Sequence, residues 1–142
     1  MDKILTLLIM VFLHFIADYQ VQGILARMKQ REWWKAQRMD SEMYSRDYKA
    51  ALLAHSFEWA FIIQLPFLYD IYWKCWGWEK FCIMAVSVYT GLLLLNTTVH
   101  YLVDNAKANK QTINLIADQT WHMAQVAVTW LVYVLVIADH WK

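Results

Sequence analysis

Four long apolar stretches constrain this chain more than any other feature of its sequence. They run over residues about 3–24, 50–72, 79–105 and 112–139. A helix needs about 20 predominantly apolar residues to cross the hydrocarbon core of a bilayer, and each stretch is near or above that length. Apolar residues make up 60% of the chain, with three glycines and one proline, which is typical of helical membrane proteins. The sequence therefore predicts an all-α protein, a four-helix transmembrane bundle that forms a single domain over residues 1–142.

The distribution of basic residues predicts how this bundle is oriented. The basic loop of about 25–49 holds seven Lys or Arg, and the other loop on that side adds Lys107 and Lys110. The opposite side has four basic residues, Lys3, Lys74, Lys80 and Lys142. Cytoplasmic loops are enriched in Lys and Arg. Nine basic residues on one side against four on the other predict that the 25–49 loop is in the cytoplasm and that both termini are outside. We therefore expect a multi-pass protein of the inner (cytoplasmic) membrane, with the lipid bilayer as its immediate partner.

Ionisable side chains recur at one end of all four stretches. In three stretches a histidine and an aspartate lie four residues apart, a spacing that turns a helix by roughly 400° and places both on one face. The predicted topology brings them, together with the histidine of the second stretch, into one layer near the cytoplasmic face. Ionisable residues at membrane depth usually mark function, whereas His140 lies at the opposite face. The seven residues of the layer are His14, Asp18, His55, His100, Asp104, Asp118 and His122.

Imidazole and carboxylate together predict a metal site. They suit zinc, iron, manganese and similar divalent ions, and seven ligands are too many for one tetrahedral ion. We expect one or two ions, with zinc as the metal, and some of the seven as outer partners that orient the ligands. Two ions about 3.5–4 Å apart could activate a hydroxide and clamp the oxygens of an ester substrate.

Three residues are candidates for catalytic roles in such a site. Asp118 could orient a ligand or a water, and Lys107, one turn after Asp104, could neutralise a phosphate oxygen. Glu58 lies almost one turn after His55 and could act as an acid or base. The alternatives are a topological role for Lys107 and an interhelical hydrogen bond for Glu58. The function we expect is metal-dependent hydrolysis of a phosphoester or a lipid headgroup, with a phospholipid or other phosphorylated substrate.

Two other functions stay open at this point. One is a non-enzymatic phage or bacterial membrane protein that binds a host membrane partner, or a second copy of itself, and uses a metal or polar cluster as a structural staple. The other is a proton or ion pathway, which also uses buried His and Asp. A pathway should have polar groups through the whole thickness of the membrane, whereas the halves of the four stretches away from the histidines are apolar. The aromatic and basic segment of about 30–38 favours the membrane interface, and a net charge of +1 disfavours nucleic acid. Cys75 and Cys82 either form a disulfide or pack independently.

The order of the motifs resembles a known family. His14–Asp18 reads H-x-x-x-D, Leu52–His55 reads L-L-A-H, His100–Lys107 reads H-x-x-x-D-x-x-K and Asp118–His122 reads D-Q-x-x-H. This series resembles, over nearly the whole chain, the small bacterial and phage membrane proteins of the domain of unknown function 3307 family. Members often carry a second histidine four residues after L-L-A-H, where this chain has Trp59, so Glu58 is a candidate substitute. More distantly, H-x-x-x-D resembles the membrane-bound metal-dependent hydrolases related to zinc phospholipase C and P1 nuclease, which implies phosphoester hydrolysis.

Overall fold

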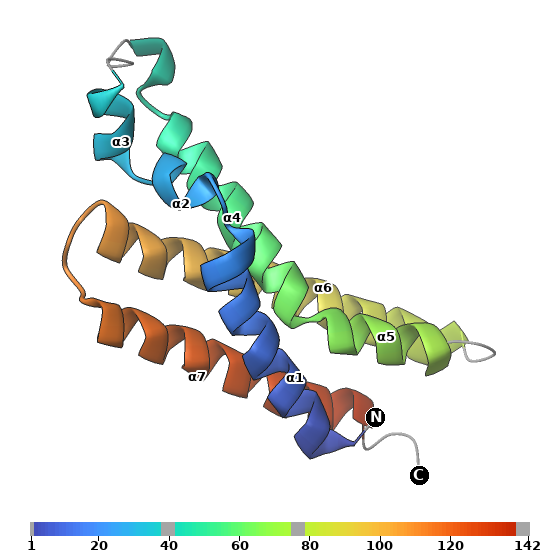
Figure 1. The fold of residues 1–142 in the computed structure, drawn as a ribbon. Coiled ribbons are helices and arrows are strands. Elements are labelled where there is room, and N and C mark those ends of the chain that lie inside the picture. Colours follow the sequence, from blue (N-terminus) through green and yellow to red (C-terminus); the bar gives the residue numbers. More distant parts are fainter. Residues whose placement is uncertain (1, 38–41, 75–78, 139–142) are drawn as a thin grey trace.

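The computed structural model describes residues 2–37, 42–74 and 79–138, and within these ranges it contains helices and no strand (Figure 1). The all-α prediction is thereby confirmed. The elements in chain order are α1 (Lys3–Ile16), η1 (Ala17–Val21), α2 (Leu25–Met28), α3 (Arg31–Ala36), η2 (Glu42–Tyr44), α4 (Asp47–Ile63), α5 (Leu65–Lys74), α6 (Glu79–Ala108), α7 (Leu115–Tyr133) and η3 (Val134–Ala138).

Local side chains explain where the first helix begins and where the chain leaves it. The Asp2 carboxylate accepts hydrogen bonds from the backbone N–H groups of Ile4 at 3.0 Å and Leu5 at 2.9 Å, which caps α1. At its other end α1 continues into the π-helical η1. Gly23 follows with a φ of +47°, a left-handed conformation that glycine adopts without steric cost. This turn sends the chain into α2, which packs against α4.

The helix expected over 50–72 is two helices rather than one. α4 begins at Asp47, and a bend of 49° separates it from α5 at Gln64. Pro66 explains the break, because proline has no N–H to donate and its ring clashes with the carbonyl oxygen four residues earlier. The basic loop also contains the short helices α2, α3 and η2 rather than irregular chain.

Two helical segments among the described residues are long and apolar enough to cross a membrane, Lys3–Val21 and Cys82–Ala108. The bent pair of α4 and α5 makes a third if it counts as one span. α7 is not among them, because its first half carries Asp118, Gln119, His122 and Gln125. The structure therefore permits a membrane protein, with two or three candidate spans where the sequence predicted four.

Polar residues are unusually frequent in the interior compared with that of a water-soluble protein. Among the described residues, fifteen buried residues are polar or charged and fifteen are apolar. Large apolar side chains such as Phe12 of α1, Leu94 of α6 and Leu131 of α7 point outward. α1 packs against α4 and α7, and α6 also packs against both α4 and α7, so these four helices enclose the polar interior (Figure 1). Such an exterior suits a lipid solvent.

A second buried polar group lies apart from the predicted layer. The Tyr133 hydroxyl donates a hydrogen bond to Oδ2 of Asp70, and both residues are buried. The ring of Tyr133 stacks on Phe67 with centroids 4.3 Å apart. Asp70 belongs to none of the predicted motifs, and its burial in α5 shows that polarity is not confined to one end of the helices.

Candidate metal centre

The structure gathers all seven predicted ligand residues in its interior, and each is buried. They come from four places in the chain: the end of α1 with η1, the middle of α4, the last third of α6 and the start of α7. Helical spacing explains part of this, since His100 with Asp104 and Asp118 with His122 project from single faces of α6 and α7. Two groups of three could hold a metal ion: Asp18, His55 and His100, and His100, Asp104 and His122.

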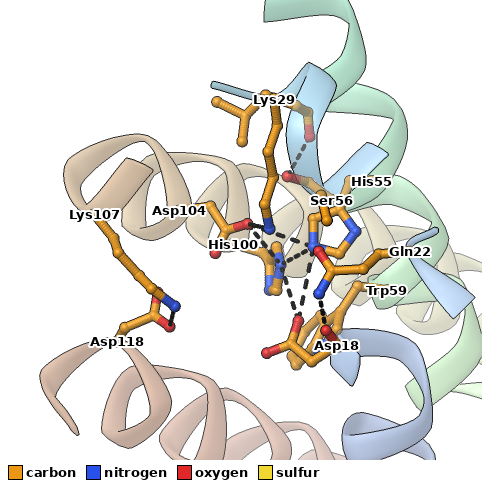
Figure 2. A network of polar contacts seen from close by, with 12 residues as sticks. Asp18, Gln22, Lys29, His55, Ser56, Trp59, His100, Asp104, Lys107 and Asp118 are labelled. Carbon is orange, nitrogen blue, oxygen red and sulfur yellow. Dashed lines mark hydrogen bonds and ion pairs between the residues drawn. The ribbon is translucent and has the colours of Figure 1, made fainter. Parts of the chain in front are cut away.

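Asp104 adds a fourth candidate ligand beside the two imidazoles of the first group (Figure 2). Nε2 of His55 lies 3.2 Å from Nε2 of His100 and 3.4 Å from Oδ2 of Asp104. Oδ1 of Asp18 lies 3.7 Å from Nε2 of His55 and 4.0 Å from Nε2 of His100. Oδ2 of Asp104 lies 3.6 Å from Nε2 of His100. A tetrahedral ion bound at about 2.0–2.1 Å separates its ligand atoms by about 3.3 Å, so four of these five separations would have to shorten around a bound ion.

The second group overlaps the first. Nε2 of His122 lies 3.3 Å from Oδ1 of Asp104 and 3.4 Å from Oδ1 of Asp118. The His100 ring is stacked on the His122 ring, with centroids 4.1 Å apart. His100 belongs to both groups, and each of its polar contacts given above is made by Nε2. Because one imidazole nitrogen has one lone pair, it binds one ion, and the two groups are alternative positions for an ion rather than a pair of sites.

His14 lies beside the cluster with both of its ring nitrogens engaged elsewhere. Its Nδ1 accepts a hydrogen bond from the indole Nε1 of Trp59 at 3.0 Å, and its Nε2 is 3.1 Å from Oε1 of Gln119. Neither ligand group contains His14. The wider π-helical turn of η1 separates the direction of Asp18 from that of His14, so a spacing of four does not bring both to one ion here.

Trp59 occupies the position at which the resembled family often has a histidine. Its ring stacks on His100 with centroids 4.3 Å apart and an interplanar angle of 27°. Glu58, the proposed substitute, is half-buried and belongs to neither ligand group. The described residues therefore give α4 one ligand candidate, His55, and a tryptophan that supports the other rings.

Lys29 is the member of the site that the sequence analysis missed. Its Nζ lies 2.6 Å from Oδ2 of Asp104, and its side chain is 14% exposed. The Asn109 side chain holds the backbone at this point: its Nδ2 donates to the carbonyl oxygen of Lys29 at 3.1 Å, and its Oδ1 accepts from the N–H of Arg31 at 2.8 Å. No periodic pattern marks Lys29, since it lies just after the short helix α2 in a segment rich in basic residues.

Lys107 reaches the other side of the cluster. Its Nζ lies 2.6 Å from Oδ2 of Asp118, and its side chain is 37% exposed. A polar pocket of about 400 Å³ opens between Lys29 and Lys107 and has Asp104 in its lining, along with Gln22, Gln30 and Gln111. Of the seven predicted ligands, Asp104 is the one that lines this pocket, beside the two ammonium groups.

Two predicted features lie wholly or partly outside the described residues. His140, expected at the opposite face, is outside them. Cys82 forms a disulfide bond, while Cys75, its candidate partner in the sequence, is outside the described residues.

Comparison with known proteins adds no relative. No family model, no curated protein and no solved structure matches this chain. The resemblance drawn from the motifs therefore stays a prediction, and the function has to be argued from the site itself.

Proposed function

We propose that this chain is a membrane-embedded protein that binds one divalent metal ion, with zinc as the metal. The proposed ligands are His55 and His100, with Asp18 and Asp104. The two imidazole nitrogens lie 3.2 Å apart, and each carboxylate oxygen lies 3.4–4.0 Å from both of them, which supports a four-coordinate ion. The shared use of His100 favours one ion over the two that the number of candidate ligands had suggested.

The formal charges of the site also favour a single ion. Three carboxylates, those of Asp18, Asp104 and Asp118, contribute three negative charges, and Lys29 and Lys107 contribute two positive ones, which leaves −1 with neutral imidazoles. One divalent ion changes this sum to +1, and two would change it to +3. Uncompensated charge in a protein interior is costly. A net charge of +1 is balanced by one singly charged anion, such as a phosphodiester.

We propose hydrolysis of a phosphoester or a lipid headgroup as the reaction. The observation that carries this proposal is the polar pocket with Lys29 and Lys107 at its sides and Asp104 in its lining. The two ammonium groups are placed to bind phosphate oxygens beside the ligand cluster, and Asp118 to orient a water. A bound divalent ion would supply a water of lowered pKa as nucleophile. A purely structural metal site would be closed to solvent and substrate.

A four-helix transmembrane arrangement with the pocket at the cytoplasmic face completes the proposal. α7 turns its polar residues inward, while Leu115, Ile116 and Val128 are exposed, so its outer surface suits lipid. The pocket opens on the side of the basic 25–49 segment, which supports a cytoplasmic position. The disulfide at Cys82, near the other end of α6, supports an oxidising compartment there.

Elemental analysis of protein purified in detergent without chelator tests the metal. We expect about one divalent transition-metal ion per chain and loss of the ion in a His55→Gln, His100→Gln variant. Thr120→Ala, at an exposed position of α7, is the control and should keep the ion. A metal-free original protein would refute the site.

The loaded protein is then assayed on phosphodiesters, phosphomonoesters and phospholipids, alongside an Asp118→Asn variant with its thermal stability measured in parallel. Turnover that the variant loses while it stays folded supports the enzyme. Full metal occupancy without turnover of any substrate would favour a structural staple in a non-enzymatic membrane protein.

One observation favours a proton pathway as a second candidate function. Buried polar side chains continue away from the cluster: His122 Nδ1 is 3.4 Å from Gln125 Oε1, Gln125 Nε2 donates to Asn96, and Asn96 Nδ2 donates to the Thr129 hydroxyl. However, Gln125 and Asn96 are amides, which donate and accept hydrogen bonds but do not readily pass on an excess proton. Proton flux into vesicles containing the reconstituted protein, abolished by Gln125→Leu, would establish this function instead.

A further inference from the structure

We propose that Trp59, His14 and Gln119 form a positioning relay that orients the carboxylates of Asp18 and Asp118. The three side chains come from α4, α1 and α7 and are joined by hydrogen bonds of 3.0 Å between Trp59 and His14 and 3.1 Å between His14 and Gln119. Trp59 and His14 are fully buried. The inference rests on the proposed function in one respect, namely that Asp18 binds a metal ion and Asp118 orients a water beside it.

The direction of every hydrogen bond in the relay follows from one group. The indole Nε1–H of Trp59 can only donate, so Nδ1 of His14 must accept and carry no proton. The neutral His14 ring then has its proton on Nε2, which donates to Oε1 of Gln119. The amide of Gln119 is thereby fixed with its NH₂ group toward the cluster. A tryptophan that cannot change its hydrogen-bonding role sets the orientation of an amide on another helix.

The two protons of that NH₂ group are shared between two carboxylates. Nε2 of Gln119 donates to Oδ2 of Asp18 at 2.9 Å and to Oδ2 of Asp118 at 3.2 Å. In each aspartate the other oxygen faces an imidazole: Asp18 Oδ1 lies 3.7 Å from His55 Nε2, and Asp118 Oδ1 lies 3.4 Å from His122 Nε2. Gln119 therefore selects the oxygen that Asp18 presents to the ligand cluster, and it does the same for Asp118 together with Lys107, whose Nζ lies 2.6 Å from the same oxygen. Its NH₂ group also separates two negative groups with a donor.

The relay gives His14 a role different from the one the sequence predicted. With Nδ1 accepting and Nε2 donating, no lone pair of His14 is available to a metal ion. His14 and Gln119 are positioning residues that act through Asp18 and Asp118. Residues that orient metal ligands in this way typically account for a 10–100-fold difference in metal affinity when they are substituted.

Metal affinity of the full-length protein in detergent, measured by competition with a zinc chelator, is the first test. Gln119→Met keeps the length of the side chain but removes both the acceptor and the donors, and Trp59→Phe removes the first donor. We expect each to weaken zinc binding by about 10–100-fold. Gln64→Met is the matched control, since Gln64 is a buried glutamine whose amide donates to the carbonyl oxygen of Ala60, in its own helix. Zinc affinity within about threefold of the original in the Gln119 and Trp59 variants would overturn the relay.

The second test begins with the unsubstituted protein, so its main result does not depend on whether a variant folds. Nitrogen-15 NMR of the histidine side chains in micelles should show His14 protonated on Nε2 and unprotonated on Nδ1, both without metal and with zinc. In Trp59→Phe, the Nδ1-protonated form should appear. Protonation of His14 on Nδ1 in the original protein, or direct coordination of zinc by His14, would overturn the inference. If the original protein binds no zinc, the proposed function fails, while the His14 tautomer still decides the relay.

Discussion

Substitution of Lys29 by methionine should have opposite effects on metal binding and on catalysis. The Lys29 ammonium lies 2.6 Å from an oxygen of Asp104 and is 14% exposed, so it neutralises a buried carboxylate that the proposed ion would also use. Removal of one partner from a buried ion pair costs about 3–5 kcal/mol. The partial exposure of Lys29 places the expected cost in the metal-free protein near the lower limit, about 3 kcal/mol.

The cost should be smaller when the ion is bound. Asp104 then has the divalent charge as its partner, and Lys29 resembles one member of an exposed pair, with a contribution of about 1 kcal/mol or less. The difference of about 2 kcal/mol appears as tighter binding of the metal, by about 30-fold. Turnover should fall, by about 100-fold, because a positive group that would contact the phosphate has been removed.

The assay is zinc affinity by chelator competition together with kcat/KM on a phosphodiester. Lys35→Met is the control, since Lys35 also pairs with a carboxylate, that of Glu32 at 2.8 Å, but at an exposed position of α3. It should change neither quantity. If Lys29→Met weakens zinc binding, the reasoning is refuted, because Lys29 would then support the metal rather than compete with it for Asp104.

Three further outcomes are expected. A cysteine at Ser45, which is exposed, should be protected from an impermeant reagent in intact cells and become labelled after lysis; labelling of intact cells would invert the topology. Tyr133→Phe removes the hydroxyl that binds Asp70 and should lower stability by about 1–3 kcal/mol in a thermal unfolding measurement, with the metal content unchanged; a loss of metal would show that the two polar groups are coupled. Glu58→Gln should leave both zinc affinity and turnover unchanged, and a large loss of turnover would restore Glu58 as the acid or base.

The pairs of ionisable residues could be predicted because helical spacing is a local property. His100 with Asp104 and Asp118 with His122 share a face in any regular helix, and four apolar stretches predict which ends come together. The helix break before Pro66 could also be predicted, because proline interrupts a helix and its position is known from the sequence. The hydrogen-bonding role of His14 could not be predicted from the sequence, because a π-helical turn follows it and its partners lie on two other helices.

Lys29 shows a different limit. Its position depends on the left-handed turn at Gly23 and on the Asn109 side chain, 80 residues further along the chain, which bonds its backbone. In the sequence, Lys29 is one of seven basic residues in the 25–49 loop, and nothing distinguishes it from the other six. Gln119 adjoins the predicted ligand Asp118 in the sequence, but its role arises only when helix packing brings Asp18 to the start of α7.

The apolar exterior has a consequence for what holds the four helices together. Lipid tails are as apolar as leucine, so in a bilayer no hydrophobic force drives such surfaces toward one another. In a bilayer, cohesion would then come from van der Waals packing and from the hydrogen bonds and ion pairs of the interior, many of which belong to the His and Asp cluster and its neighbours. In a soluble enzyme a scaffold is stable first and a site is placed on it. In a membrane, the polar centre of this protein would contribute to holding the helices together, so the groups that would do the chemistry would also stabilise the fold.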